Sequence, residues 1–438
     1  MRVLKFGGTS VGSAERMKKV SHLISDGIPK IVVLSAMSGT TNCLVEIARA
    51  FYQKDSVTVN TLINELNIRY EVVVADLYKT EKGGLLGKEL IKKHFDYLRS
   101  FDIHSFAFNE EHAILAQGEL ISTALFHYFL EENGVDSVLL PALDFMRTDD
   151  NDEPDLLYIE EHLRKIIAGL TQKNLFITQG YICRNASGAI SNLQRGGSDY
   201  SATLIGAALF SDEVQIWTDI DGMHNNDPRI VEKTKPVAEL SFDEAAELAY
   251  FGAKVLHPTC VNPARLRNIP VRLLNTLQPE AKGTVISDKS SGDNIKAVAA
   301  KDGIIAINIV STRMLMAYGF LRSVFEVFER YKTPIDMIST SEVAVSLTID
   351  TLKNLDAIIE EIGTFGTVSV EHKQTIICIV GDFLADKTGY AVKIFEAMKQ
   401  VPIRMISYGG SKNNISLLIN TIHKNEALKA LNKGLFDL

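Results

Sequence analysis

The sequence contains little cysteine and no long apolar run. Its four cysteines, Cys43, Cys183, Cys260 and Cys378, are far apart in the 438-residue chain and form no CxxC pair. This spacing argues against a disulfide framework or a zinc site and favours free thiols in a cytoplasmic protein. No stretch reaches the roughly 18 consecutive apolar residues of a membrane span, and Lys5 interrupts the first apolar run, so we expect neither a signal peptide nor membrane attachment.

Positive charge is also scarce. The chain has 46 Lys and Arg against 54 Asp and Glu, with a formal net charge of -8 and no basic run. This balance disfavours a nucleic-acid-binding surface. The apolar fraction of 46% and the charged fraction of 23% are typical of globular proteins, and the length predicts two or three domains at about 150 residues each.

Short runs rich in β-branched residues alternate with segments of helical periodicity. The runs are apolar on both faces, as strands between helices should be. The alternation predicts an α/β fold with a mostly parallel sheet, whose ligands bind at the carboxyl ends of the strands, where Lys5 and Ser35 lie. The runs cover 30–36, 137–142, 175–181, 213–219 and 271–275, and the helical segments cover 14–25, 57–78, 110–131, 159–170 and 199–210.

The pattern changes after a polar stretch that predicts a linker over 288–294. Beyond it, PIDMIS at 334–339 nearly repeats as PIRMIS at 402–407, which indicates two copies of one βαββα(β) unit. The second copy lacks its last strand, so we expect 295–300 to supply it. The predicted strands are 304–310, 335–339, 343–349, 367–371, 375–380, 403–407 and 415–420. The predicted domains are 1–287, then 304–373, then 295–303 together with 374–438.

A lysine precedes a glycine-rich turn at the start of the chain. Lys5 lies in a short apolar run, and Gly7 and Gly8 follow it. The spacing is not that of a P-loop, yet the N–H groups of a glycine-rich turn and one fixed cation suffice to bind phosphate. The alternative is a strand and a glycine turn with an exposed lysine.

A second motif, residues 193–202, directly precedes a predicted helix. It places Arg195, Ser198 and Asp199 beside two glycines, which permit close approach of the backbone to a ligand. The helix start offers free N–H groups and partial positive charge to an anion. A capped turn with a solvated arginine explains the same residues, because cap signals are common.

Three weaker motifs complete the candidate site. Residues 217–229 gather acidic groups and Arg229, which suit a ribose, a metal or a phosphate but also a surface loop. Lys254 suits a phosphate contact or simply solvent. Glu119 follows a glycine in a helical pattern, which indicates either a close approach or a poor helix position. Together the motifs predict a site for an anionic, nucleotide-sized ligand at one edge of the sheet.

The combination of motifs resembles that of the aspartokinases, which phosphorylate the β-carboxylate of aspartate with ATP. The segments that carry the resemblance are KFGGTSVGS, LSAMSGTTN, QGE, TQGY, LQRGGSDYSA, WTDIDGMHNNDPR and GAKVLHP, in that order over residues 1–287. The repeats after them resemble tandem ACT domains. The resemblance implies an amino-acid-kinase fold followed by two ferredoxin-like ACT domains. It also implies ATP and Mg²⁺ as cofactors and the first step of lysine, threonine and methionine biosynthesis.

The resemblance also implies roles for residues at matching positions. Lys5 and Asp199 would be catalytic, the lysine neutralising charge on the transferred phosphoryl group and the aspartate orienting the reacting groups. Tyr181 and His224 depart from the phenylalanine and tyrosine common in relatives. The aspartate site would comprise Ser35, Thr41, Glu119, Tyr181, Arg195 and Ser198. The nucleotide site would comprise Lys5, Gly7, Gly8, Thr218, Asp219, His224, Arg229 and Lys254, and no dedicated metal ligands are expected.

The C-terminal repeats resemble the regulatory half of the lysine-sensitive class. This implies inhibition by L-lysine rather than threonine and a homodimer or homotetramer formed through the ACT domains. Asp336 or Glu342 would meet an ammonium group of the effector, although Met314, Phe320 and Leu321 also suit an ordinary ACT core. The effector residues implied are Met314, Gly319, Phe320, Leu321, Asp336, Thr340, Ser341 and Glu342.

Two other functions remain open. One is a different small-molecule kinase of the same fold, such as a glutamate kinase, which the paired repeats and residues 195–202 argue against. The other is a non-catalytic amino-acid sensor, which the presence of both Lys5 and Asp199 argues against. The length leaves no chain for a nicotinamide domain, so we expect a monofunctional enzyme.

Overall fold

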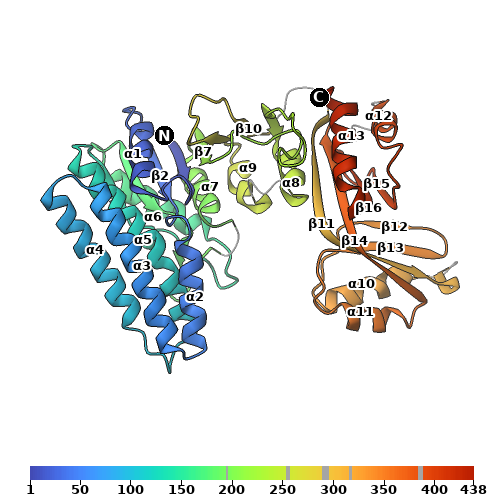
Figure 1. The fold of residues 1–438 in the computed structure, drawn as a ribbon, viewed down its shortest axis with the longest axis horizontal. Helices are drawn as coiled ribbons and strands as arrows, with labels where there is room; N and C mark the ends of the chain where they lie inside the picture. The colour runs from blue at the N-terminus through green and yellow to red at the C-terminus, as the bar shows by residue number, and fades with distance from the viewer. Residues whose placement is uncertain (194–195, 253–256, 289–294, 315–317, 383–387) are drawn as a thin grey trace. The chain divides into compact units, whose positions relative to one another are not determined.

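The computed structural model describes residues 1–193, 196–252, 257–288, 295–314, 318–382 and 388–438 (Figure 1). The chain divides into two compact units. The first comprises Met1–Met223, Ala238–Phe242 and Leu256–Ser290, and the second comprises His224–Val237, Asp243–Val255 and Ser291–Leu438. The first unit therefore differs from the domain expected over 1–287, because the described residues 224–237 and 243–252 pack within the second unit. The expected linker falls almost wholly on 289–294, outside the described residues.

The first unit contains an eight-stranded sheet with β1 (Arg2–Phe6) near its centre. The strand order is β3-β4-β2-β1-β7-β9-β10-β8, and every pair is parallel except β9 with β10. The mostly parallel sheet agrees with the sequence prediction, and β2 is buried at every residue. The flanking strands are β2 (Lys30–Leu34), β3 (Val138–Leu140), β4 (Leu175–Gln179), β7 (Glu213–Thr218), β8 (Glu239–Ser241), β9 (Val271–Asn275) and β10 (Thr284–Ser287).

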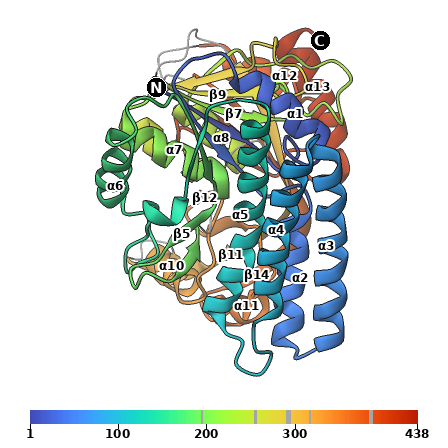
Figure 2. The same cartoon turned by 90° about the vertical axis from the view of Figure 1, so that its left-hand side faces the viewer.

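Helices cover the sheet of the first unit (Figure 2). Four of them pack side by side: α2 (Thr40–Tyr52), α3 (Ser56–Leu77), α4 (Glu81–Arg99) and α5 (Phe108–Glu132). The sequence analysis did not predict α2 and α4. α5 is long and apolar enough to cross a membrane, but 83% of its most apolar window is buried inside the protein, as in a core helix. The helices also include α1 (Ala14–Ile24), α6 (Leu156–Ala168), α7 (Gly197–Leu209) and α9 (Asn262–Leu266). A two-stranded ribbon, β5 (Ile182–Arg184) with β6 (Ile190–Asn192), lies between β4 and α7 in the chain.

The second unit is built on a six-stranded antiparallel sheet of order β12-β13-β11-β14-β16-β15. Its central strands are long: β11 (Ile295–Val310) pairs with β14 (Thr367–Gly381). The separate strands predicted at 295–300 and 304–310 are thus one strand, and those at 367–371 and 375–380 are another. An irregularity in the register between Lys301 and Ile304 lets β11 continue through both halves.

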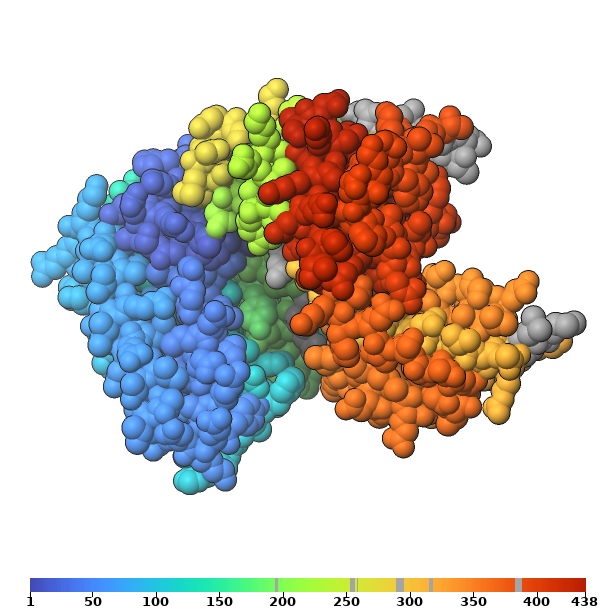
Figure 3. All heavy atoms as spheres, turned by 45° about the vertical axis from the view of Figure 1, so that its right-hand side comes forward, coloured from blue at the N-terminus to red at the C-terminus, as the bar shows by residue number. Residues whose placement is uncertain are grey.

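Each half of this sheet has its own helices and apolar core. In the space-filling view the first half is the orange lobe and the second half the red lobe (Figure 3). Residues Ile295–Lys301 of β11 pair with the second half of β14, where the missing strand was expected. The first half contains α10 (Phe320–Arg330), β12 (Ile338–Thr340), β13 (Ala344–Ile349) and α11 (Leu355–Ile362). The second contains α12 (Tyr390–Ala397), β15 (Met405–Tyr408), β16 (Asn414–Asn420) and α13 (Lys424–Phe436).

Candidate active site

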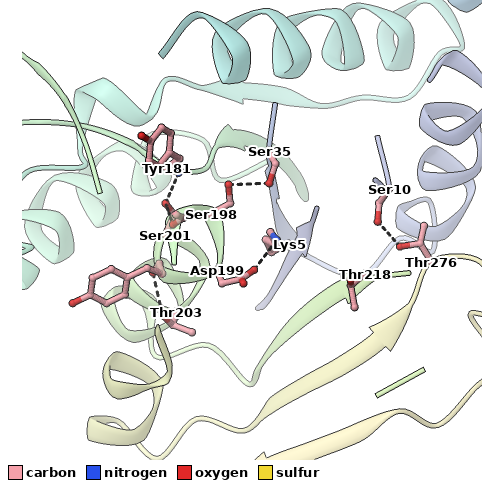
Figure 4. A network of polar contacts seen from close by, with 12 residues as sticks. Lys5, Ser10, Ser35, Tyr181, Ser198, Asp199, Ser201, Thr203, Thr218 and Thr276 are labelled. Atoms are coloured by element: carbon pink, nitrogen blue, oxygen red, sulfur yellow. Dashed lines mark hydrogen bonds and ion pairs between the residues drawn. The ribbon is translucent and has the colours of Figure 1, made fainter. Parts of the chain in front are cut away.

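An ion pair links the central strand to a helix start in the first unit. Lys5 Nζ lies 2.6 Å from Asp199 Oδ1, and the two side chains are only 11% and 17% exposed (Figure 4). β1 fixes the lysine, and the first turn of α7 fixes the aspartate. Gly196 and Gly197 enter this helix with φ of 68° and 47°, a backbone conformation that favours glycine. The predicted catalytic pair is therefore assembled from residues 194 positions apart in sequence.

The glycine turn that follows Lys5 packs closely against its neighbours. Gly7 N donates a hydrogen bond of 3.2 Å to Trp217 O at the end of β7, and Ser38 N donates one of 3.1 Å to Gly8 O. A Cβ on Gly8 would lie 2.8 Å from Ala36 O, so only glycine fits there. The turn thus brings backbone, rather than side chains, next to the lysine, as a phosphate site requires.

A cavity of about 410 Å³ adjoins this turn. Ser35 Oγ donates a hydrogen bond of 2.9 Å to Ser198 Oγ at its wall (Figure 4). Arg195, the sixth predicted aspartate residue, lies outside the described residues. The other five line this one cavity: Ser35, Thr41, Glu119, Tyr181 and Ser198. Gly8, Thr9, Ala36, Met37, Ser38, Gly39, Asn42 and Gly197 line it too, and of these only Gly8 was among the predicted site residues.

Glu119 is a buried carboxyl group in this cavity wall. Its Oε1 accepts a hydrogen bond of 3.1 Å from Ala36 N, whereas Oε2 is buried without a hydrogen-bond partner among the described residues. Burial raises the pKa of Glu119 to about 8. A Cβ on the preceding Gly118 would lie 2.8 Å from Ala36 Cβ, so this glycine permits the close approach that was one of its two interpretations. The site therefore holds a carboxyl group that a bound cation would ionise.

Tyr181 adopts a left-handed backbone conformation, with φ of 67°. Non-glycine residues are strained there and are held by their surroundings. Tyr181 N donates a hydrogen bond of 2.8 Å to Ser201 Oγ on α7, which fixes the turn after β4 (Figure 4). Sequence reasoning missed Ser201, although it lies within the motif at 193–202. The spacing of the serines in that motif could have indicated it, because Ser198 and Ser201 are three residues apart on one helix.

Three of the predicted nucleotide residues, Lys5, Gly7 and Gly8, lie in β1 and in the turn after it, as described above. Thr218 and Asp219, at the end of β7, line a small crevice with Ser10, Arg16 and Thr276. Ser10 Oγ and Thr276 Oγ1 are 2.7 Å apart, which ties the glycine turn to the end of β9 (Figure 4). Sequence reasoning missed Arg16 and Thr276, because neither belongs to a motif.

Two further predicted nucleotide residues lie outside the first unit. His224 and Arg229 belong to the second unit. There, His224 Nδ1 lies 2.7 Å from Thr234 Oγ1, and Arg229 forms an ion pair of 2.7 Å with Asp227. Lys254 lies outside the described residues.

Comparison with known proteins identifies the family. The sequence profile of the amino acid kinase family matches residues 1–275, and that of the ACT domain matches residues 377–435. The chain is 33% identical over 455 residues to lysine-sensitive aspartokinase 3 of Escherichia coli, with 99% of each protein covered. The chain belongs to the aspartokinase family. It is also 37% identical to the chloroplastic aspartokinase 3 of Arabidopsis thaliana, covering 99% of this chain and 81% of the relative.

Solved structures support the same assignment. E. coli aspartokinase III in complex with aspartate and ADP has a TM-score of 0.84 and 31% identity to this aspartokinase, covering all of both chains. The same enzyme in complex with lysine and aspartate has a TM-score of 0.82. The amino-acid-kinase fold followed by ACT domains, predicted from sequence, is thereby confirmed.

The predicted effector residues of this aspartokinase lie in different surroundings. Gly319 and Phe320 line an open cavity of about 390 Å³ at the start of α10. Met314 and Phe320 also pack against the apolar core of the first half, as their alternative interpretation had it, whereas Leu321 is 36% exposed. Thr340, Ser341 and Glu342 are exposed, and the side chain of Asp336 is 2% exposed.

Proposed function

We propose that this aspartokinase transfers the γ-phosphoryl group of ATP to the β-carboxylate of L-aspartate, forming 4-phospho-L-aspartate. The observation that carries the proposal is the ion pair of Lys5 and Asp199, which joins the strand that leads into the glycine turn to the helix that supplies Ser198 and Gly197 to the cavity wall. The aspartate and ADP complex of the E. coli relative supports both ligands. Transfer to aspartate also supports a place at the start of amino-acid biosynthesis.

The site must neutralise negative charge, and it needs no strong base to deprotonate the acceptor. The acceptor carboxylate is already ionised at pH 7, since an unperturbed aspartate has a pKa of about 3.9. The barrier lies in bringing two anions together and balancing charge on the γ-phosphoryl oxygens. Lys5 supplies a fixed positive charge, and Asp199 holds that ammonium in position. The N–H group of Gly7 is used in its bond to Trp217 O, so the turn offers the N–H group of Gly8 as a donor that needs no side-chain ordering.

The cavity residues suit the aspartate acceptor. The hydroxyls of Ser35, Thr41 and Ser198 provide hydrogen-bond donors for its carboxylates. Glu119 faces the same cavity with a free oxygen and suits its ammonium group. Arg195 would bind the α-carboxylate bidentately, as arginine does best. This set distinguishes the two ends of the substrate.

Magnesium fits as a companion of ATP rather than as a resident ion. Among the described residues, no group of three or more His, Cys, Asp or Glu is placed to hold a metal. Mg²⁺ commonly binds substrate phosphates and only one or two carboxylates. Asp199 and Asp219 are the carboxylates that would hold it, and it would supply further positive charge to the phosphates.

The second unit fits feedback regulation by L-lysine, through a first ACT domain over 304–373 and a second over 295–303 with 374–438. The lysine complex of the E. coli relative supports this effector. β12 is exposed at every residue, which suits an interface with a second copy of the chain in a homodimer or homotetramer. The four cysteines, which form no disulfide in the described part of the chain, support a cytoplasmic location.

An assay of ADP release tests this function. ATP, Mg²⁺ and L-aspartate should give ADP, whereas L-glutamate should give at most a small fraction of that rate, because its longer side chain misplaces the acceptor. Millimolar L-lysine should inhibit, and threonine should not. Equal rates with glutamate, or no ADP with aspartate, would refute the proposal.

A further inference from the structure

A buried carboxylate in the second unit is bound from two sides by other residues of the chain. Asp336 Oδ1 accepts a hydrogen bond of 2.5 Å from the hydroxyl of Tyr250 and one of 2.8 Å from Lys301 Nζ. Lys301 Nζ lies 2.9 Å from Asp350 Oδ2 and 4.2 Å from the centre of the Tyr250 ring. The three elements that meet here are the C-terminus of α8 (Phe242–Tyr250), β11 and the segment before β12.

The second carboxylate oxygen of Asp336 can still accept a hydrogen bond. Its Oδ2 is buried without a hydrogen-bond partner among the described residues, so the loss of water from this oxygen is not compensated. Burial alone would lower the pKa of Lys301, but its bonds to Asp336 and Asp350 outweigh that effect and raise it. The carboxylate therefore faces a charged ammonium that belongs to the protein itself. A second ammonium group at this oxygen would set two like charges against one carboxylate, and Lys301 has Asp350 as its other partner, so the newcomer would displace Lys301 from Asp336.

Helix α8 is attached to the ACT sheet by further contacts. Glu247 accepts hydrogen bonds from the Ser411 hydroxyl, at 3.1 Å, and from the Asn414 amide. A Cβ on Gly252 would lie 2.4 Å from Ala300 O, so the chain after α8 runs close against β11. In sequence, however, α8 lies inside the amino acid kinase match of residues 1–275. Lys254 of the proposed nucleotide site follows Tyr250 by four positions.

We propose that Lys301 and the ammonium group of an amino-acid effector compete for Asp336, and that binding of the effector releases Tyr250 from this carboxylate. Lys301 is thus an internal stand-in for the effector. Because Lys301 also lies over the Tyr250 ring, its displacement frees the end of α8. The proposal rests on the regulation by L-lysine stated above, and it adds the residue that sets the sensitivity and the helix that responds.

The first test compares inhibition by L-lysine in three full-length proteins. Lys301→Met keeps the apolar stem over Tyr250 but removes the competing charge, so half-inhibition should need about tenfold less lysine, the effect of one charged hydrogen bond. Lys301→Arg keeps the charge, so its lysine concentration for half-inhibition should stay within about twofold of that of the natural protein. This is well under the roughly tenfold change expected for the loss of one charged hydrogen bond. An unchanged or higher lysine requirement in Lys301→Met overturns the competition.

The second test does not depend on activity. Hydrogen exchange of the amides of residues 243–250 should increase when L-lysine is added to saturation, because the Tyr250 contact is lost. Unchanged exchange overturns the release of α8, even if lysine inhibits. Conversely, increased exchange in a protein that makes no ADP would refute the proposed kinase activity and leave the competition for Asp336 standing.

Discussion

Lys5 and Asp199 lie side by side, 2.6 Å apart, at the meeting of β1 and α7. Neither residue is placed by its own sequence neighbourhood alone, because the parallel pairing of β1 with β7 brings the two ends of the site together. Gly8 of the turn proposed for phosphate and Ser198, the neighbour of Asp199, both line the cavity proposed for aspartate. The predictions below test what each part contributes.

Removal of the Lys5 charge should affect turnover far more than aspartate binding. We expect Lys5→Met to lower kcat by about 100-fold or more, the loss typical of one preorganised electrostatic contact, with the KM for aspartate within about threefold. Steady-state kinetics check this. Lys5→Arg is the matched control, since it keeps the charge but not the compact geometry. A kcat that stays within a factor of two in Lys5→Met would rule out the role.

Glu119 should make stability depend on pH. Its pKa in the folded protein is about 8, raised by burial from an ordinary value of 4.5. The folded state thus holds this proton more tightly than the unfolded state does. Its contribution to stability is present in full below pH 4.5 and is lost as the pH rises through about 8. Glu119→Gln cannot ionise and should lose less stability over that range in urea titrations at several pH values. Parallel curves for the two proteins would contradict the burial argument.

A methyl group at Gly180 should disturb the aspartate cavity. The added Cβ would lie 2.3 Å from Ser198 Cβ, so Gly180→Ala must displace Ser198. We expect the KM for aspartate to rise about tenfold or more, which corresponds to the loss of one or two hydrogen bonds. Gly84→Ala is the control, because a Cβ there meets nothing within 4 Å inside helix α4. That variant should be as active as the natural protein and slightly more stable.

Glu342 should influence inhibition but not folding. Its side chain is exposed, so Glu342→Gln should leave the melting temperature unchanged. If Glu342 meets an effector ammonium group, half-inhibition should require about fivefold more L-lysine, at the lower end of usual coupling energies. Isothermal titration with lysine checks the same loss without catalysis. Unaltered lysine affinity would remove Glu342 from the effector site.

Much of the first unit could be predicted, because its signals are local. The apolar runs that became β2, β4 and β7 are short, and hydrophobic periodicity marks α5 and α7 directly. The close approach at Gly118 is a steric property of one position, and it is one of the two interpretations that the sequence supports.

The parts that were missed depend on contacts between distant segments. β11 and β14 are each one strand because they pair with each other along most of their length, which no local pattern contains. Residues 224–237 belong to the second unit through contacts such as Asn226 Nδ2 with Leu428 O, at 2.9 Å, more than 200 positions away. The sequence does not predict the hydrogen bonds of Ser10 with Thr276 and of Lys301 with Asp336, because each joins residues that are far apart in the chain.

One measurement tests the central claim most directly. Acyl phosphates react with hydroxylamine, so the product of phosphoryl transfer to aspartate can be trapped as its hydroxamate and quantified. The natural protein with ATP, Mg²⁺ and L-aspartate should form the hydroxamate in step with ADP, and Lys5→Met should form about 100-fold less or lower still. ADP without hydroxamate, or hydroxamate formed at the natural rate by Lys5→Met, would contradict the account.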